Sequence, residues 1–244
     1  MSTALAMSIF VSVLGPCIGS FIGVCAERIP ANKSVIFGRS ACSVCRVPLG
    51  WRELVPVVSF VSQRGRCRRC HASIPPWLLY LEIAAGGLGV LAALAGGDAS
   101  LILLNALFLW LLLALAVIDV MSFRLPDPFT FGLGVVALAK APDIEVALWG
   151  GFFGGASFLL VRLVYRAIRR REGLGLGDVK LMIGLGAATG PFDLPILVLL
   201  AAVFALAGAW ITRGSNDGLG ASRAVPFGAA LCASMFCLWL AGVP

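Results

Sequence analysis

Charged residues are scarce in this sequence: Asp, Glu, Lys and Arg make up 13% of its 244 residues, against about 25% in ordinary globular proteins. Only 12 residues are acidic, and there is one histidine. By contrast, 60% of the residues are hydrophobic and the mean hydropathy is +0.99. A core formed by a chain of this length cannot bury so much apolar surface, so the composition excludes a soluble domain. It predicts an all-α, polytopic membrane protein.

The chain also lacks the marks of a cleaved signal peptide. No basic segment precedes the first apolar stretch, which is too long and too rich in glycine for a signal peptide, so we expect it to be retained as a helix. A bilayer core about 30 Å thick needs roughly 20 apolar residues per helix. We predict eight spans, of which the fourth and sixth are short: 4–25, 76–96, 100–119, 128–141, 147–166, 179–190, 194–212 and 225–243.

Basic residues are nearly absent from one side of this predicted topology. If residues 26–75 face the cytoplasm, all 19 Lys and Arg residues except Lys140 lie in a cytoplasmic turn or at the cytoplasmic end of a helix. This asymmetry is the positive-inside pattern of membrane proteins. It predicts a multi-pass protein of the cytoplasmic (inner) membrane with both termini in the periplasm. It also accounts for the net charge of +7 without nucleic acid as a partner.

Residues 26–75 form the one long polar insertion, and they carry four of the eight cysteines. These are arranged as Cys42-x-x-Cys45 and Cys67-x-x-Cys70, with 21 residues between the pairs. Two such pairs supply four thiolates for one tetrahedral Zn²⁺, each pair forming a knuckle. The alternatives are two disulfides, which a reducing cytosol disfavours, redox chemistry, or free thiols. His71, next to Cys70, could replace one thiolate, but with four thiols present we interpret it as a bystander.

Carboxylates are rare within the apolar segments, where each one is energetically costly. Asp119 ends the third predicted span, Asp178 begins the sixth, and Glu82 lies one or two turns inside the second. The topology puts Asp119 and Asp178 at the same depth on the cytoplasmic side. Two adjacent carboxyls in a partly dry site cannot both ionise easily, so one can act as general acid while the other activates water, as in aspartic proteolysis. Gly175 and Gly177 would allow close approach of another backbone. Ion translocation or helix packing is the alternative role for each aspartate.

These residues resemble a known family. Gly175-x-Gly177-Asp178 resembles the motif of the Gly-x-Gly-Asp intramembrane aspartyl proteases, specifically the type IV prepilin peptidases. The chain departs from that family at Gly23, where Asn is usual, and at Met121, where a second acidic residue is common. Further matching motifs occur in the family's order, and they are Gly19-Ser20-Phe21 with Arg28 and Pro30, the two Cys-x-x-Cys pairs, Glu82 with Gly86, Asp119 with Leu125-Pro126-Asp127, and Pro226-Phe227-Gly228.

The resemblance implies an enzyme that cleaves prepilins or pseudopilins after a short basic leader, with Asp119 and Asp178 as its catalytic dyad. It also implies N-methylation of the new N-terminus with S-adenosyl-L-methionine, because the cysteine-bearing loop marks the bifunctional members. No glycine-rich methyltransferase fingerprint is visible in the sequence, so the residues that bind the methyl donor are not assigned. The residues expected to bind substrate or to support the dyad are Glu82, Glu172, Gly175, Gly177 and Lys180.

We therefore expect a first transmembrane helix (1–25), a cytoplasmic four-cysteine, zinc-binding subdomain resembling a zinc ribbon (26–75), and a transmembrane aspartyl peptidase domain (76–244). The expected partners are prepilin or pseudopilin substrates and membrane lipid, and no particular oligomeric state is predicted. One alternative is a peptidase without methyl transfer. Another is a non-enzymatic zinc-ribbon scaffold or a proton-coupled transporter. A transporter would be expected to show paired repeats and carboxylates at mid-membrane, and the sequence shows neither.

Overall fold

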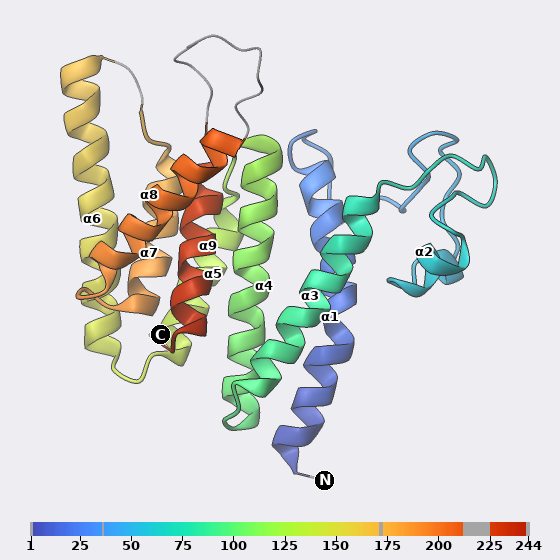
Figure 1. The fold of residues 1–244 in the computed structure, drawn as a ribbon, viewed down its shortest axis with the longest axis horizontal. Helices are drawn as coiled ribbons and strands as arrows, with labels where there is room; N and C mark the ends of the chain where they lie inside the picture. The colour runs from blue at the N-terminus through green and yellow to red at the C-terminus, as the bar shows by residue number, and fades with distance from the viewer. Residues whose placement is uncertain (1, 36, 171–172, 212–224, 243–244) are drawn as a thin grey trace. The chain divides into compact units, whose positions relative to one another are not determined.

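A computed structural model of the chain describes residues 2–35, 37–170, 173–211 and 225–242 (Figure 1). Within these ranges the regular structure is helical, apart from two isolated β-bridges that join Ala41 to Pro48 and Arg66 to Ser73. The prediction of an all-helical protein is confirmed for the described part of the chain. The chain divides into two compact units, residues 1–110 and 111–244.

Each of the eight predicted spans coincides with a helix. The helices are α1 (Thr3–Arg28), α2 (Val58–Ser62), α3 (Pro76–Leu94), α4 (Ala99–Ser122), α5 (Asp127–Lys140), α6 (Ile144–Arg169), α7 (Leu176–Thr189), α8 (Leu194–Ile211) and α9 (Phe227–Leu240), with a 3-10 helix η1 (Trp51–Glu53) before α2. Among the described residues, α1, α3, α4, α6 and α8 are long and apolar enough to cross a membrane. The protein is therefore a multi-pass membrane protein. The helices α5, α7 and α9 have 14 residues each, about 21 Å, so a count of eight spans stays a prediction.

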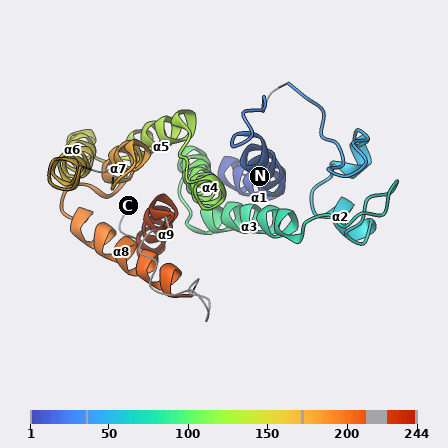
Figure 2. The ribbon, with the colours of Figure 1, turned by 90° about the horizontal axis from the view of Figure 1, so that it is seen from above.

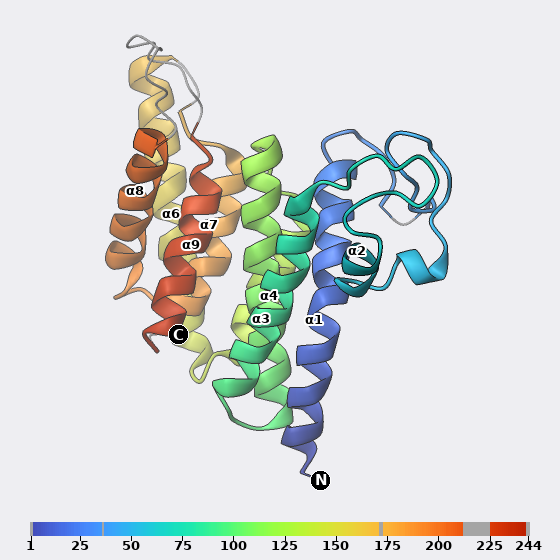
Figure 3. The same ribbon diagram turned by 45° about the vertical axis from the view of Figure 1, so that its right-hand side comes forward.

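Small residues set the packing of the first compact unit. Helices α1 and α3 lie side by side in Figures 1 and 3, and glycines of each helix meet the backbone of the other. A Cβ added at Gly15 would lie 2.5 Å from the carbonyl oxygen of Ala85, and one added at Gly19 would lie 2.6 Å from the Cα of Glu82. Close approach through small residues spaced four apart is a common way for helices to associate in membranes.

In the second compact unit, glycines likewise allow α6 and α7 to pack closely. Gly150 and Gly186 touch through their backbones, and a Cβ at Gly154 would lie 2.6 Å from the carbonyl oxygen of Met182. Helix α5 packs on another face of α7, where Gly184 approaches the backbone of Gly134. Helices α8 and α9 lie against each other, as Figure 2 shows from above. Helix α7 is thus buried among neighbours in spite of its short length.

The turn between α4 and α5 is tight and places the end of α4 close to the start of α5. Helix α4 ends at Ser122, and Phe123 adopts a left-handed conformation with φ of 52°. Pro126 then caps α5, whose second residue is also a proline, and neither can extend the preceding helix. The side chain of Leu125 projects from this turn toward the first residues of α7 and α9.

Candidate active site and cysteine cluster

Asp119 lies in the last turn of α4 and is 5% exposed. Its carboxylate accepts a hydrogen bond from the backbone N–H of Ala229 at 2.8 Å and another from that of Gly228. Both donors belong to the first turn of α9, where backbone N–H groups have no partner within the helix and the helix dipole is positive. The N-terminal end of α9 therefore binds an anion, and that anion is the carboxylate of Asp119.

Gly228 makes this arrangement possible. A Cβ at this position would lie 3.0 Å from Oδ2 of Asp119 and 3.0 Å from Cδ1 of Leu125. Both distances are shorter than ordinary van der Waals contact. Any larger residue would push the carboxylate away from the helix end, so the Pro226-Phe227-Gly228 motif holds Asp119.

Asp178 is the third residue of α7 and is half-buried. Its carboxylate reaches back to accept a hydrogen bond from the backbone N–H of Gly175 at 3.3 Å. Just before Gly175, the carbonyl of Leu174 accepts a hydrogen bond from the guanidinium of Arg162, a buried residue of α6. The carboxylate of each aspartate thus lies at the N-terminal end of a helix. For Asp178 this is its own helix, α7, and for Asp119 it is α9.

The structure brings these two aspartates together. Their carboxyl groups are near enough to interact electrostatically, and both act on the thiol of Cys232, a fully buried residue of α9. Leu125 packs between their supports, because added Cβ atoms at Gly177 and Gly228 would each lie 3.0 Å from its side chain. Two carboxyls at one partly buried site can divide the roles of proton donor and proton acceptor.

The residues expected to support the dyad lie in different surroundings. Lys180 forms an ion pair with Asp127 at 2.6 Å, which joins α7 to the start of α5 on an exposed surface. Glu82 belongs to the first compact unit, where its carboxylate accepts the backbone N–H of Val57 at 2.7 Å. Glu172 lies outside the described residues. Gly175 and Gly177 flank Leu176 directly before Asp178, as described above.

The four cysteines of the polar insertion converge on one point. Their sulfur atoms all lie within 4.8 Å of one another. Sγ of Cys42 is 3.8 Å from Sγ of Cys70, and Sγ of Cys45 is 4.0 Å from Sγ of Cys67. Four sulfurs placed 2.3 Å from a tetrahedral zinc ion would be about 3.8 Å apart. All eight cysteines are free thiols in this structure, and the cluster has the dimensions of a four-cysteine metal site.

The two halves of this cluster repeat each other with an offset of 25 residues, a symmetry that the sequence analysis missed. In the first knuckle the N–H of Cys42 bonds to the carbonyl of Val47, and the N–H of Arg46 bonds to that of Cys42. In the second, Cys67 bonds to Ala72, and His71 to Cys67, in the same way. Arg46 and His71 share the left-handed conformation, with φ of 55° and 57°. His71 therefore occupies the turn position that closes a knuckle.

The thiols of the cluster differ in acidity. Backbone N–H groups of Cys45 and Val44 lower the pKa of Cys42 to about 6, and those of Cys70 and Arg69 lower the pKa of Cys67. The N–H of Ala72 also lowers the pKa of Cys70, but desolvation and the three neighbouring thiols outweigh it and raise this pKa to about 11. Four thiolates cannot form this close together without a cation among them. Such donors fit a divalent metal ion.

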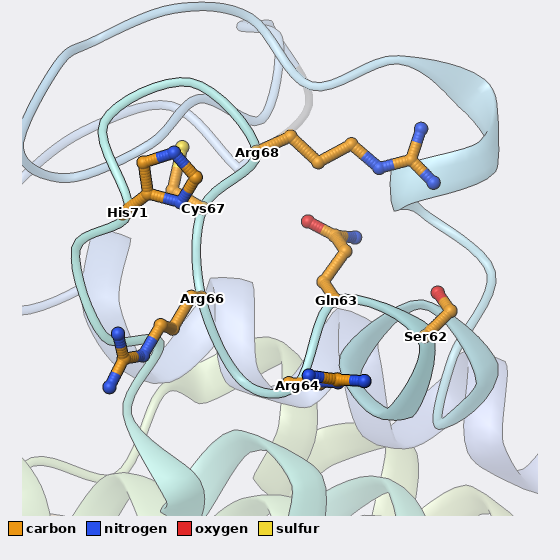
Figure 4. Close-up of a pocket in the computed structure, with 7 residues that line it drawn as sticks. All are labelled: Ser62, Gln63, Arg64, Arg66, Cys67, Arg68 and His71. Carbon is orange, nitrogen blue, oxygen red and sulfur yellow. The ribbon is translucent and has the colours of Figure 1, made fainter.

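A surface depression of about 640 Å³ lies between the second knuckle and α2. Figure 4 shows Cys67 and His71 at one side of it and Ser62 and Gln63, from the end of α2, at the other. Three arginines complete its lining, and they are Arg64, Arg66 and Arg68. This depression has a strongly positive lining.

Sequence reasoning did not find several residues that hold the aspartates. The sequence places Arg162 only among the basic residues at the cytoplasmic ends of helices, although its position in an otherwise apolar stretch is a usable sign of a further role. Leu125 and Gly228 had been noted as parts of motifs, without a physical role. Their roles appear only when the turn after α4 and the start of α9 are seen together.

Residues 13–95 match the bacterial peptidase A24 N-terminal domain, and residues 106–210 match the type IV leader peptidase family. A protein of Klebsiella pneumoniae named prepilin leader peptidase/N-methyltransferase is 34% identical over 203 residues, which cover 79% of this chain and 89% of the relative. The chain belongs to the type IV leader peptidase family.

Other members of the type IV leader peptidase family are similarly related. A type 4 prepilin-like proteins leader peptide-processing enzyme of Escherichia coli is 30% identical, covering 93% of this chain and 91% of its own length. A prepilin leader peptidase/N-methyltransferase of Neisseria gonorrhoeae is 28% identical, and the match covers 94% of this chain and 89% of the relative. No solved structure matches the chain. The family resemblance expected from the motifs is confirmed.

Proposed function

We propose that this protein cleaves the leader peptide from type IV prepilins or pseudopilins at the cytoplasmic face of the inner membrane, and N-methylates the N-terminus that cleavage exposes. The observation that carries the proposal is the pair formed by Asp119 and Asp178, each held at the beginning of a helix. Family membership supports it, since the relatives are named as leader peptidases and N-methyltransferases. A non-enzymatic scaffold and a transporter are not favoured.

In the proposed reaction one carboxyl is ionised and the other is protonated. The ionised carboxylate takes a proton from water as the water oxygen attacks the scissile carbonyl carbon. The protonated carboxyl gives its proton to the carbonyl oxygen, so a neutral gem-diol forms. When the C–N bond breaks, the carboxyl that took the proton from water gives it to the amine nitrogen, and the other carboxylate takes a hydroxyl proton from the gem-diol, so the leader leaves as a carboxylic acid. Each carboxyl then has its starting protonation state and the pair is ready for another cycle.

The chain's own residues keep this pair in place. The N–H groups of Gly228 and Ala229 fix Asp119, while that of Gly175 fixes Asp178. Gly177 lets the α4–α5 turn approach α7. Such fixed backbone dipoles need no reorganisation during the reaction.

The remaining predicted residues take supporting roles in this proposal. Lys180 ties α7 to α5 through Asp127, and Glu82 binds the backbone N–H of Val57, directly before α2. We also propose that Glu172 contacts the basic leader, because it is negatively charged and lies just before the Gly-x-Gly-Asp motif.

Cys42, Cys45, Cys67 and Cys70 would hold one structural Zn²⁺ and so order the proposed cytoplasmic subdomain 26–75. S-adenosyl-L-methionine would supply the methyl group for transfer to the new α-amine. The transmembrane part, residues 76–244, would carry the peptidase.

We also propose the eight-span topology with both termini in the periplasm. The two ends of the insertion 26–75, at α1 and α3, place it on a single side, and its nine basic residues favour the cytoplasm. The short helices α5, α7 and α9 would cross with the help of their packed neighbours.

The test is to co-express a prepilin with variants of the full chain and to measure the mass of the prepilin's N-terminus. Asp119→Asn and Asp178→Asn should each abolish cleavage while the protein still inserts into the membrane. Asp143→Asn is the matched control, because Asp143 caps α6 and Asn caps a helix equally well. Full cleavage by either dyad variant would refute the assignment. In the same spectra, a cleaved but unmethylated product from the wild type would indicate a peptidase without methyl transfer.

A further inference from the structure

The segment from Trp51 to Val61 exposes a row of large apolar side chains. Trp51, Val58 and Val61 are 73%, 63% and 64% exposed, and Leu54 and Val55 are also exposed. Trp51 belongs to η1, Val58 and Val61 belong to α2, and Leu54 and Val55 lie in the turn between these two helices, which contact each other. We call these five residues the apolar patch. Exposed apolar patches on otherwise polar subdomains mark sites of contact with a partner or a membrane.

A hydrogen bond fixes the position of α2, which carries part of this patch, along the axis of the apolar helix α3. The backbone N–H of Val57, directly before α2, donates to the carboxylate of Glu82 at 2.7 Å. Glu82 is six residues beyond Pro76, the first residue of α3, which places it about 9 Å along the helix axis. The start of α2 is therefore held beside α3, about 9 Å along its axis from its first residue, and not beyond the end of that helix.

The backbone conformation at Val57 indicates that this placement is enforced. Val57 has φ of 60° and ψ of −53°, a conformation that β-branched residues rarely adopt. Strain of this kind persists only where the surroundings fix the residue. Here Glu82 binds the backbone of Val57, directly before α2, and Phe60 in the middle of α2 packs on Gly65.

Basic residues adjoin the apolar patch. The guanidinium of Arg52 lies 4.9 Å from the ring centre of Trp51. At the other end of α2 begins the depression of Figure 4, lined by Arg64, Arg66 and Arg68. A guanidinium group can bind two oxygens of one phosphate at once. A cluster of guanidinium groups would also repel a basic leader peptide. The charge of this surface therefore favours an anionic occupant.

We propose that the apolar patch lies in the interface of the cytoplasmic leaflet and that the arginine-lined depression binds an anionic phospholipid headgroup. Aromatic and aliphatic side chains at headgroup depth, with basic residues beside them, are the features of interfacial anchors. The inference rests on the proposed cytoplasmic side of residues 26–75, and it does not depend on proteolysis. It makes the cysteine subdomain a second membrane-binding part of the protein, besides its spanning helices.

Fluorescence quenching of Trp51 tests the proposal in the full chain reconstituted in liposomes. The signal of Trp51 is obtained as the difference between the wild type and Trp51→Phe. We expect it to be quenched by lipids brominated near the headgroup and protected from aqueous iodide. Quenching by iodide alone would show a patch in water, and quenching by neither would show a patch covered by protein. Either result would overturn the proposal. Prepilin cleavage measured in the same liposomes reports on the proposed function separately.

The headgroup site is tested by charge reversal. In liposomes with phosphatidylglycerol, Arg64→Glu should lower the ratio of docked to undocked subdomain roughly five- to thirtyfold. Arg39→Glu is the matched control, because it changes the same charge outside the depression and should have a much smaller effect. Equal effects of both variants, or no dependence on phosphatidylglycerol, would refute a headgroup site. Loss of docking on adding inorganic phosphate would overturn a lipid as the occupant in favour of a free anion.

Discussion

Replacing Gly228 with alanine is the sharpest test of how the site is built. Gly228 is the second residue of α9, and a side chain added there would point at the carboxylate of Asp119. An added methyl group would lie 3.0 Å from Oδ2 and 3.1 Å from Cγ of Asp119. Ordinary contact begins near 3.4 Å, so the carboxylate has to move by several tenths of an ångström.

The cost follows from the hydrogen bonds that this movement stretches. The N–H of Ala229 donates to Asp119 at 2.8 Å, and the bond is assisted by the charge of the carboxylate. Such a bond contributes roughly 1.5–3 kcal/mol. If it positions the carboxylate during the reaction, its loss should lower kcat roughly 10- to 150-fold, since about 1.4 kcal/mol corresponds to a factor of ten.

The assay is the rate of prepilin cleavage by the full-length variant in proteoliposomes, with kcat and KM measured separately. We expect a fall in kcat with little change in KM, because substrate binding does not involve the methyl group. Gly87→Ala is the control, because an added Cβ there meets nothing within 4 Å. A Gly228→Ala enzyme that inserts normally and cleaves at the wild-type rate would refute the idea that the start of α9 sets Asp119.

The other predictions concern metal and packing. Cys42→Ser should reduce zinc from one ion per chain to a small fraction and leave residues 26–75 more sensitive to limited proteolysis; full metal content measured by atomic absorption would contradict the four-cysteine site. Gly150→Ala should lower the free energy of unfolding in detergent by about 1–3 kcal/mol, because its methyl group would overlap the backbone of Gly186, whereas Gly87→Ala should not. A double-mutant cycle on Lys180 and Asp127 should give a coupling below about 1 kcal/mol, because their side chains are 49% and 70% exposed.

Much of the fold was predictable from the sequence because its evidence is local. The length of an apolar segment shows where in the sequence a membrane helix lies. The predicted span 194–212, for example, differs by one residue from α8 (Leu194–Ile211). The spacing Cys-x-x-Cys likewise predicts a knuckle without knowledge of the rest of the chain. That the two pairs meet, with all four sulfur atoms within 4.8 Å of one another, is shown only by the structure.

The roles of single residues were less predictable, because they depend on partners far away in the sequence. Glu82 had been expected to serve the substrate or the dyad, yet its observed partner is the backbone of Val57. Nothing in the sequence near Glu82 indicates that partner, since Val57 lies in an irregular segment with an unusual backbone conformation. In the sequence the 25-residue repeat of the knuckles is visible only in the cysteines. The matching backbone hydrogen bonds and the left-handed conformation of Arg46 and His71 could not be predicted from the side chains, because the other side chains of the two knuckles differ.

The sequence by itself determined the membrane setting and the positions of the helices, and it predicted the cysteine cluster and the two aspartates of the proposed site, since composition and short motifs carry that information. Only the tertiary structure decided that Asp119 lies at the start of a helix 110 residues away, and that Leu125 separates the two aspartate supports. The physical reason is that helix formation depends on neighbouring residues. Which helix end meets which carboxylate depends on the approach of whole helices, here set by glycines that allow their backbones to touch.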